Sequence, residues 1–390
     1  MTRAGGWRVP MAGRDREESH RASTPLELFF DLVIVIAVAA ASRSLHHGIA
    51  EDHVPESILS YLMVFFAIWW AWMSFSWFAT AYDTDDVPYR VGVLVQMSGA
   101  IIIAAGVGRA FEAGDWTVVT LGYVVMRLAT VALWMRAARG DPEHRANSMR
   151  WVMGVTIAQV GWILLLFAPD GLKLPGFLFL VVAELFVPIW AARAKRMRFH
   201  AEHIAERYGL FTIIVLGESV LAGTVAIGTA AEEVAGIPDV AILGVALGAL
   251  LIVFVMWWLY FERSSNDLLT TIPRSFEWGY GHYVIWAAAA AVGAGVAVAV
   301  DVATHHAEVS TTVAGAAVAV PVAVYVMGTW LLHDVPRPMP AWRMALSPIA
   351  ALLVLMAPLT ATPVLAVGVI VVALLVAKVA TADVQPSPHA

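Results

Sequence analysis

The sequence contains no cysteine among its 390 residues. This absence excludes disulfide bonds, thiolate metal sites and cysteine nucleophiles. Charge is also scarce, because Asp, Glu, Lys and Arg make up 14% of the chain, against about a quarter in ordinary globular domains. There is no phosphate-binding loop, no glycine-rich dinucleotide fingerprint, no His-Glu-x-x-His motif and no Gly-x-Ser-x-Gly motif. We therefore expect no enzymatic activity, no metal centre and no cofactor.

Hydrophobic residues, by contrast, make up 60% of the chain, and the mean hydropathy is +0.75. A membrane-spanning helix needs about 20 apolar residues. The candidate spans are 26–44, 56–78, 91–111, 115–136, 151–168, 175–192, 209–229, 239–261, 281–300, 311–332, 343–360 and 362–380. The predicted fold class is all-α, a polytopic transmembrane helix bundle of about 12 spans. Only Thr360 to Pro363 divides the last two runs, so ten or eleven spans remain open.

The charged residues are distributed asymmetrically between the loops. Lys and Arg gather in residues 1–25, 137–150 and 193–208, whereas the alternate loops are acidic, as at Glu51-Asp52 and Glu232-Glu233. This asymmetry follows the positive-inside rule. It predicts a multi-pass protein of the bacterial cytoplasmic (inner) membrane with both termini in the cytoplasm. Topology accounts for the arginine clusters, so no nucleic-acid partner is predicted.

The spans divide into two groups of six that resemble each other. Trp69-Trp70 and Trp257-Trp258 occupy corresponding places in the second and eighth spans. An even number of spans in each half would make this a parallel repeat with its axis along the membrane normal. Chance similarity between apolar helices is the alternative. The predicted organisation is a cytoplasmic segment 1–25, a first half 26–192, a basic linker 193–208, a second half 209–380 and a cytoplasmic tail 381–390.

Two carboxylates open the first apolar run. Glu27 and Asp31 are four residues apart, so they share one helix face. An ionisable group inside a span is a functional hypothesis by default, and the pair predicts a cation or proton site near the inner mouth of a pathway. The alternative for Glu27 is a capping box with Ser23 or Thr24. The alternative for Asp31, which lies too deep for a cap, is a buried structural pair.

Charged residues also occur deep in later spans. Glu218 follows Gly217 in the middle of an apolar run, and Arg127 and Glu184 lie at comparable depth. One Arg and two Glu at one level predict a buried ion pair, Arg127 with Glu184, and a spare carboxylate, Glu218. The spare carboxylate is a candidate for proton exchange, and Gly217 is expected to allow close helix approach. The alternative is a structural Arg–Glu pair that fixes helix register.

Further polar residues complete the set of candidates. Gln96 and His282 lie in apolar runs and are candidate pathway residues. Glu206 and Arg207 precede the seventh span and are candidates for structural ion pairs. Neighbouring His203, three residues after His200, is interpreted as part of a solvated helix end and not as a metal ligand.

Three segments and one histidine carry a family resemblance. ELFFDLVIVIAVA at 27–39, HIAERYGLFTIIVLGESVLA at 203–222, MWWLYFE at 256–262 and His282 resemble the bacterial low temperature requirement protein A family. The resemblance implies an integral membrane protein named for a growth phenotype in the cold. It implies that Glu27, Asp31, Glu206, Arg207, Glu218 and His282 are family positions, without assigning them roles. Phe29-Phe30-Asp31 also resembles the Phe-x-Asp of potassium channels built from two six-span repeats, although the seventh span carries no Asp there.

These observations predict a transporter or channel for an unidentified small solute or ion, with intramembrane carboxylates as proton or cation sites. The rival hypothesis is a non-transporting membrane protein that supports envelope integrity or cold and stress adaptation. A membrane-embedded enzyme acting on lipid would need a converging base and nucleophile, and the sequence shows no recognised set. The lipid bilayer is the expected partner, and the sequence leaves the oligomeric state open.

Overall fold

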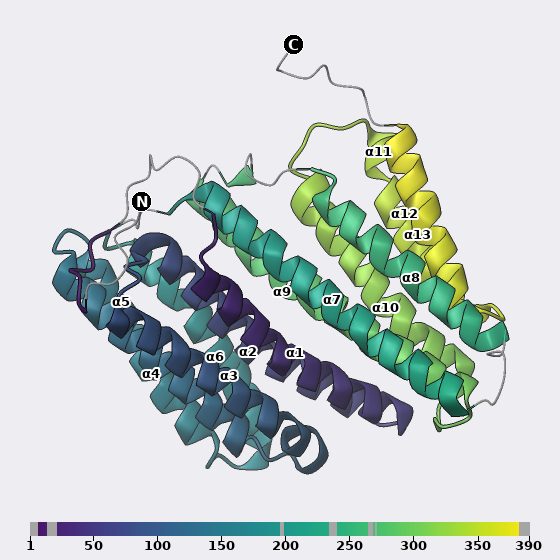
Figure 1. Ribbon diagram of the computed structural model, residues 1–390, viewed down its shortest axis with the longest axis horizontal. Coiled ribbons are helices and arrows are strands. Elements are labelled where there is room, and N and C mark those ends of the chain that lie inside the picture. The colour runs from purple at the N-terminus through teal and green to yellow at the C-terminus, as the bar shows by residue number, and fades with distance from the viewer. Residues whose placement is uncertain are drawn as a thin grey trace. The chain divides into compact units, whose positions relative to one another are not determined.

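The computed structural model describes residues 7–13, 22–195, 199–233, 240–263, 268–269 and 271–381. Helices account for nearly all of this part of the chain, and it contains no strand. In chain order they are α1 (Pro25–Ala50), α2 (Val54–Tyr82), α3 (Val87–Ala113), α4 (Thr117–Gly140), α5 (Arg145–Leu165), α6 (Asp170–Ala192), α7 (Ala201–Glu233), α8 (Val240–Phe261), α9 (Ile272–Ala303), α10 (Thr311–Thr329), η2 (Trp330–Asp334), α11 (Ala341–Met344), α12 (Leu346–Met356), η3 (Ala357–Leu359) and α13 (Pro363–Ala380) (Figure 1). The predicted all-α fold is confirmed.

Among the described residues, twelve helical segments are long and apolar enough to cross a membrane. The last two are separate, because the chain leaves the helical conformation at Thr360 and α13 begins at Pro363. Proline suits the first turn of a helix, where its missing N–H is not needed. The prediction of twelve spans is therefore confirmed for the last two apolar runs, where the sequence had left ten or eleven spans open.

The chain forms two compact units. Unit 1 consists of Met1–Ala41 and Ser60–Phe211, and unit 2 of Ser42–Leu59 and Thr212–Ala390. The division inside α7 falls close to the predicted end of the basic linker. The segment 42–59 groups with unit 2 because the Ser42 hydroxyl donates to the Ala290 carbonyl at 3.2 Å and the Glu308 N–H donates to the Ala50 carbonyl at 2.9 Å. The repeat relation between the halves stays a prediction.

The basic linker is shorter than predicted, because α7 already begins at Ala201. The His203 N–H donates to the His200 ring at 3.4 Å, and the Ile204 N–H donates to the His200 carbonyl at 3.1 Å. His200 therefore acts as a capping residue, a role that satisfies N–H groups left over at a helix start. The last part of the polar segment is thus the first two turns of a span.

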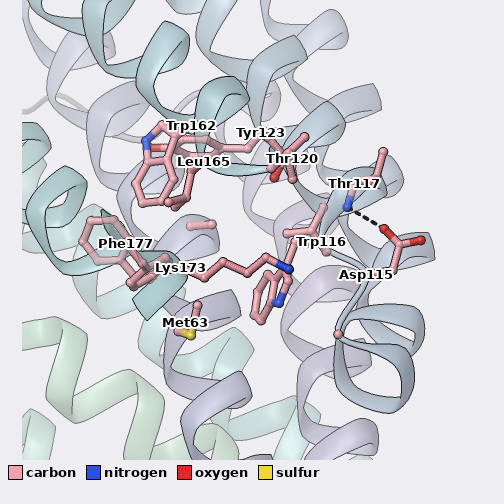
Figure 2. Close-up of a pocket in the computed structure, with 15 residues that line it drawn as sticks. Met63, Asp115, Trp116, Thr117, Thr120, Tyr123, Trp162, Leu165, Lys173 and Phe177 are labelled. Atoms are coloured by element: carbon pink, nitrogen blue, oxygen red, sulfur yellow. Dashed lines mark hydrogen bonds between the residues drawn. The ribbon is translucent and has the colours of Figure 1, made fainter. Parts of the chain in front are cut away.

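In unit 1, α3 packs on α4, α4 on α5 and α5 on α6. Gly99 and Gly122 face each other where α3 crosses α4. A Cβ atom added at Gly122 would lie 2.6 Å from the Gly99 carbonyl oxygen, and one at Gly99 would lie 2.7 Å from the Gly122 carbonyl oxygen. Small residues let helix backbones approach closely in membranes. A cavity of about 180 Å³ opens among α2, α4, α5 and α6 of this unit (Figure 2).

Candidate functional site

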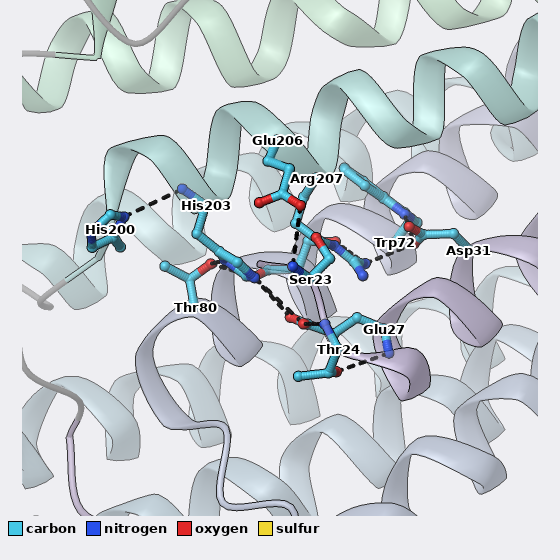
Figure 3. A network of polar contacts seen from close by, with 11 residues as sticks. Ser23, Thr24, Glu27, Asp31, Trp72, Thr80, His200, His203, Glu206 and Arg207 are labelled. Atoms are coloured by element: carbon cyan, nitrogen blue, oxygen red, sulfur yellow. Dashed lines mark hydrogen bonds and ion pairs between the residues drawn. The ribbon is translucent and has the colours of Figure 1, made fainter. Parts of the chain in front are cut away.

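The site begins at the first turn of α1. The Thr24 N–H donates to Glu27 Oε2 at 2.8 Å, and the Glu27 N–H donates to Thr24 Oγ1 at 3.2 Å (Figure 3). This reciprocal pair is a capping box, and Pro25 occupies the first helical position. The structure therefore contains the local arrangement that the spacing of Thr24 and Glu27 predicted.

Glu27 also faces α7, where it meets His203. Nε2 of His203 lies 3.3 Å from Glu27 Oε1 and 3.4 Å from Oε2, while Nδ1 lies 2.9 Å from Thr80 Oγ1 on α2 (Figure 3). The His203 side chain is fully buried. The interpretation of His203 as part of a solvated helix end is therefore wrong, because α7 starts early enough to carry it into the packed interior of unit 1.

The tautomer of His203 sets the direction of its two side-chain contacts. A neutral imidazole has one N–H and one acceptor nitrogen. With the N–H on Nε2 the ring donates to Glu27 and accepts from the Thr80 hydroxyl at Nδ1, and with both nitrogens protonated it donates to Glu27 and to Thr80. In both states an N–H faces the Glu27 carboxylate.

Asp31 lies one turn further along α1 and pairs with Arg207, one turn further along α7. Asp31 Oδ1 accepts from Arg207 Nη2 and from Trp72 Nε1, both at 2.7 Å, and Arg207 Nη2 also donates to Ser76 Oγ at 3.1 Å (Figure 3). Both charged side chains have no exposed surface. Among the described residues Asp31 Oδ2 and Arg207 Nε and Nη1 have no hydrogen-bond partner. We call Glu27, Asp31, His203 and Arg207 the α1–α7 cluster.

Glu206 lies beside this cluster but outside it. Its Oε1 accepts from the Ser23 N–H at 3.2 Å at an exposed position. Within the described part of the chain Glu206 forms this backbone hydrogen bond and no ion pair with Arg207, which is engaged by Asp31.

A second buried pair lies elsewhere in unit 1, where Arg127 of α4 donates to Glu184 of α6 at 2.7 Å. Both side chains are fully buried, and Arg127 also donates to Ser74 Oγ at 2.7 Å. Glu184 accepts four further hydrogen bonds, from Trp70, Tyr123, Gln159 and Trp162 at 2.8–3.3 Å. The structure thus brings together the Arg and one of the two Glu residues that sequence depth had grouped, and it ties α2, α4, α5 and α6 to one carboxylate.

Gln96 is buried between α3 and α4. Its Oε1 accepts from Thr130 Oγ1 at 3.3 Å. No described residue pairs with the Gln96 amide nitrogen. Gln96 can therefore be a contact residue between two helices or a residue that lines a pathway.

Glu218 belongs to unit 2 and is half-buried on α7. It forms no hydrogen bond or ion pair with the described residues of the chain. The expectation that Gly217 allows close helix approach is wrong, since a Cβ atom built there meets nothing within 4 Å among them. Close approach occurs instead through Ser219, whose hydroxyl donates to the Ala289 carbonyl at 2.8 Å, and through Gly293, whose Cβ would lie 2.9 Å from the Ser219 Cα.

His282 lies on α9 of unit 2 and is fully buried. Its Nε2 is 2.8 Å from the Tyr260 hydroxyl, and its Nδ1 is 2.6 Å from the Trp278 carbonyl oxygen. Since the carbonyl can only accept, Nδ1 carries the proton and Tyr260 donates to Nε2 in the neutral ring. Tyr260 also contacts the ring of His333 on η2 at 5.1 Å.

The sequence reasoning missed a charged cluster beside His333. Lys378 Nζ lies 2.9 Å from Asp334 Oδ2 and 3.2 Å from Glu262 Oε2, and Arg343 Nη2 lies 4.0 Å from Glu262 Oε1. Asp334 ends the single π-helical turn found in the described residues, and such turns are frequent at functional sites. Lys378, a lysine inside the last apolar run, was the signal in the sequence.

Asp86 organises the turn between α2 and α3. It accepts from the N–H of Val9 at 2.7 Å and of Tyr89 at 3.1 Å, and Arg136 holds both carboxylate oxygens. Burial acts to raise the pKa of Asp86, but the hydrogen bonds from Arg136, Val9 and Tyr89 outweigh it and hold the pKa below its usual range. This carboxylate is therefore an ionised structural residue that fixes segment 7–13 to α3 and α4.

The fold and these buried ion pairs define the chain as a polytopic helical membrane protein with charged groups inside its helical units. It belongs to the bacterial low temperature requirement A protein (LtrA) family, whose model matches residues 22–380. The chain is similar to the uncharacterized protein RA0937 of Rhizobium meliloti (strain 1021), with 28% identity over 290 residues that cover 70% of this chain and 68% of the relative. No solved structure matches the chain.

Proposed function

We propose that the protein is a transporter or channel for a small solute or ion in which the α1–α7 cluster exchanges a proton or cation. The observation that carries the proposal is the pairing, one turn apart, of Glu27 with His203 and Asp31 with Arg207 in the interior of unit 1. The proposal assigns no enzymatic step to the chain. It places the chain in the bacterial inner membrane, with both termini in the cytoplasm and the cluster at the cytoplasmic ends of α1 and α7.

Energetics support a functional reading of this cluster. A buried ion pair often stabilises a fold no more than apolar side chains of the same volume would. Ionisable residues inside spans are rare and mark ion paths and proton relays. Asp31 and Arg207 keep three polar atoms without partners among the described residues, which is costly for a purely structural pair. Asp31 Oδ2 is available to a proton, a water molecule or a cation that competes with Arg207, and the two Arg207 N–H groups are available to a water molecule.

In this proposal, a proton exchanged at the contact between Glu27 and His203 supplies a chemical step. Loss of this proton leaves a carboxylate facing a neutral imidazole, one turn from the Asp31–Arg207 pair. The added negative charge favours a cation at this end of α1. Protonation removes that attraction, so proton binding and cation binding at the cluster compete.

The test is flux through purified, full-length protein in proteoliposomes. A pH-sensitive dye inside the liposomes reports proton movement. The driving force is an inward or outward gradient of Na⁺ or K⁺, or a membrane potential alone. Wild-type protein is expected to move protons in at least one condition. Glu27→Gln and Asp31→Asn should lower the rate about a hundredfold or more, the scale expected when a positioned acid–base group is removed. Glu206→Gln is the matched control, since Glu206 lies one helical turn away and is exposed.

Glu218→Gln extends the test to the half-buried carboxylate of unit 2. Wild-type liposomes that behave like empty ones in every gradient would contradict the transport proposal. Flux that is unchanged in Asp31→Asn and Glu218→Gln would remove both carboxylates from the coupling step.

A second candidate is a non-transporting membrane protein that supports envelope integrity or growth in the cold. Glu184 favours it, because its carboxylate accepts five hydrogen bonds and needs no ligand to complete them. In that case growth at low temperature would survive Glu27→Gln and Asp31→Asn and fail in Glu184→Ala. Complementation of a deletion strain distinguishes the two candidates.

A further inference from the structure

The cavity among α2, α4, α5 and α6 is lined by five aromatic rings together with aliphatic and polar side chains. Phe66, Trp116, Tyr123, Trp162 and Phe177 contribute to its walls (Figure 2). Its volume of about 180 Å³ exceeds the roughly 150 Å³ of an engineered apolar cavity that binds benzene. A ligand with one ring, or a short stretch of acyl chain, therefore fits.

The polar atoms of two of these aromatic side chains are engaged by Glu184. The Tyr123 hydroxyl and the Trp162 N–H both donate to Glu184 Oε1, at 3.0 and 3.3 Å. These polar groups are engaged behind the cavity wall, so a ligand meets their rings and not their donors. A polar group of the ligand placed against these two rings would lose its hydrogen bonds to water without gaining others, which is unfavourable. The buried part of the ligand must therefore be apolar.

The lining contains one cationic side chain, Lys173 of α6. Its ammonium lies 2.8 Å from Asp170, but the side chains are 42% and 95% exposed, and exposed ion pairs contribute little. The competing acid in the lining, Asp115, accepts from Arg109 at 2.6 Å and from the Thr117 N–H at 3.0 Å. The Thr117 hydrogen bonds, with Arg109, hold the pKa of Asp115 below its usual range. Asp115 is thus compensated locally, and Lys173 is the group that can exchange its partner.

We propose that this cavity binds an amphiphile with an apolar ring or short chain seated against Tyr123 and Trp162 and an anionic group at Lys173. Two sources share this chemistry, a free carboxylate and an anionic lipid. In unit 1 the helices alternate in direction, so the cavity, near the starts of α4 and α6, lies at the opposite end from the α1–α7 cluster at the starts of α1 and α7. The site is therefore separate from the proposed proton site.

Equilibrium dialysis of radiolabelled benzoate against the full-length protein in phosphatidylcholine nanodiscs tests the proposal. Benzyl alcohol serves as the neutral match for the same ring. Thr120→Phe fills the cavity, and Thr156→Phe places the same ring on an exposed face of α5. Lys173→Gln removes the cation, and Lys195→Gln removes a similarly exposed lysine that pairs with Glu143 at 3.1 Å.

Saturable benzoate binding is expected. Thr120→Phe and Lys173→Gln should each weaken it about tenfold, the worth of one charge-assisted hydrogen bond for the lysine. Both control variants should bind as the wild type does. Absence of saturable binding, or equal binding by the two phenylalanine variants, would overturn the site. Equal affinity for benzyl alcohol together with an unchanged Lys173→Gln variant would overturn its anionic character.

Phosphatidylglycerol nanodiscs distinguish the two sources. Both discs are measured at about 1 M salt, which screens the negative charge of the disc surface. An anionic lipid that occupies the cavity would compete, so benzoate binding would fall relative to phosphatidylcholine. Unchanged binding identifies the free carboxylate as the ligand. Either result supports the cavity as a binding site.

Discussion

Replacing Glu184 by Gln should destabilise the protein more than replacing Asp31 by Asn. In Glu184→Gln an NH₂ group replaces one of the two carboxylate oxygens. Oε2 accepts from Trp70 and Arg127, and Oε1 accepts from Tyr123, Gln159 and Trp162, so the NH₂ group faces at least two donors. The new N–H groups face donors, and Arg127 loses its counter-charge. Breaking a buried pair by removing one charge costs about 3–5 kcal/mol, and the donors left without an acceptor place Glu184→Gln at the upper end of this range.

Asp31→Asn leaves most of its contacts in place. The introduced asparagine can keep its oxygen where Oδ1 accepts from Trp72 and Arg207, and its amide nitrogen then replaces Oδ2, which has no partner among the described residues. What remains is the loss of the counter-charge of Arg207, which is fully buried. Because the hydrogen bonds are retained, we expect about 3 kcal/mol, at the lower end of the range for removing one charge of a buried pair.

The measurement is equilibrium unfolding in mixed detergent micelles, which gives the free energy of unfolding of each variant. Glu206→Gln, at an exposed position, should lie within about 0.5 kcal/mol of the wild type. Similar costs for Glu184→Gln and Asp31→Asn would refute the distinction between a satisfied structural carboxylate and an incompletely satisfied functional one.

Three further changes test the described contacts. Asp86→Asn should lower the free energy of unfolding at pH 7. Because the folded-state pKa of Asp86 is depressed, its stabilisation is present above the unfolded pKa of about 3.9 and is lost as pH falls through the folded pKa. A pH series should therefore show that the difference in unfolding free energy between wild type and variant shrinks in acid. Gly122→Val should prevent the α3–α4 crossing, which size-exclusion chromatography would show as loss of monodisperse protein. Lys378→Met should cost about 3–5 kcal/mol by leaving Glu262 and Asp334 without their shared cation, and Lys378→Arg should recover part of it in the same unfolding assay.

The sequence alone predicts relations within one helix well. The Thr24–Glu27 capping box follows from a spacing of three residues, and the shared face of Glu27 and Asp31 follows from a spacing of four. Span number follows from length and hydropathy. Depth in the membrane was enough to group Arg127 with Glu184, since both lie near the middle of their runs.

Relations between helices were harder to predict, because in a membrane protein both the packed face and the lipid face are apolar. Nothing in the sequence shows that Ser219 rather than Gly217 faces α9. The interpretation of His203 failed for a related reason: a basic, polar segment looked solvated, although its second half begins α7 and carries His203 inward. The aromatic cavity was missed because tryptophan and tyrosine are also expected at membrane interfaces.

The contrast between the two carboxylate sites of unit 1 separates the roles of their charges. A charge kept only for structure should have every lone pair satisfied, as at Glu184, because an unsatisfied buried atom costs stability without a return. A charged group that must release and rebind a partner cannot have all its hydrogen bonds made in the bound state, because the free-energy cost of losing the partner would then be too high. Asp31 has one oxygen engaged and one without a partner among the described residues, and Glu27 lies 3.3 Å from the titratable ring of His203. These contacts are what the proposed exchange requires, and flux measured in the Glu27→Gln variant tests it.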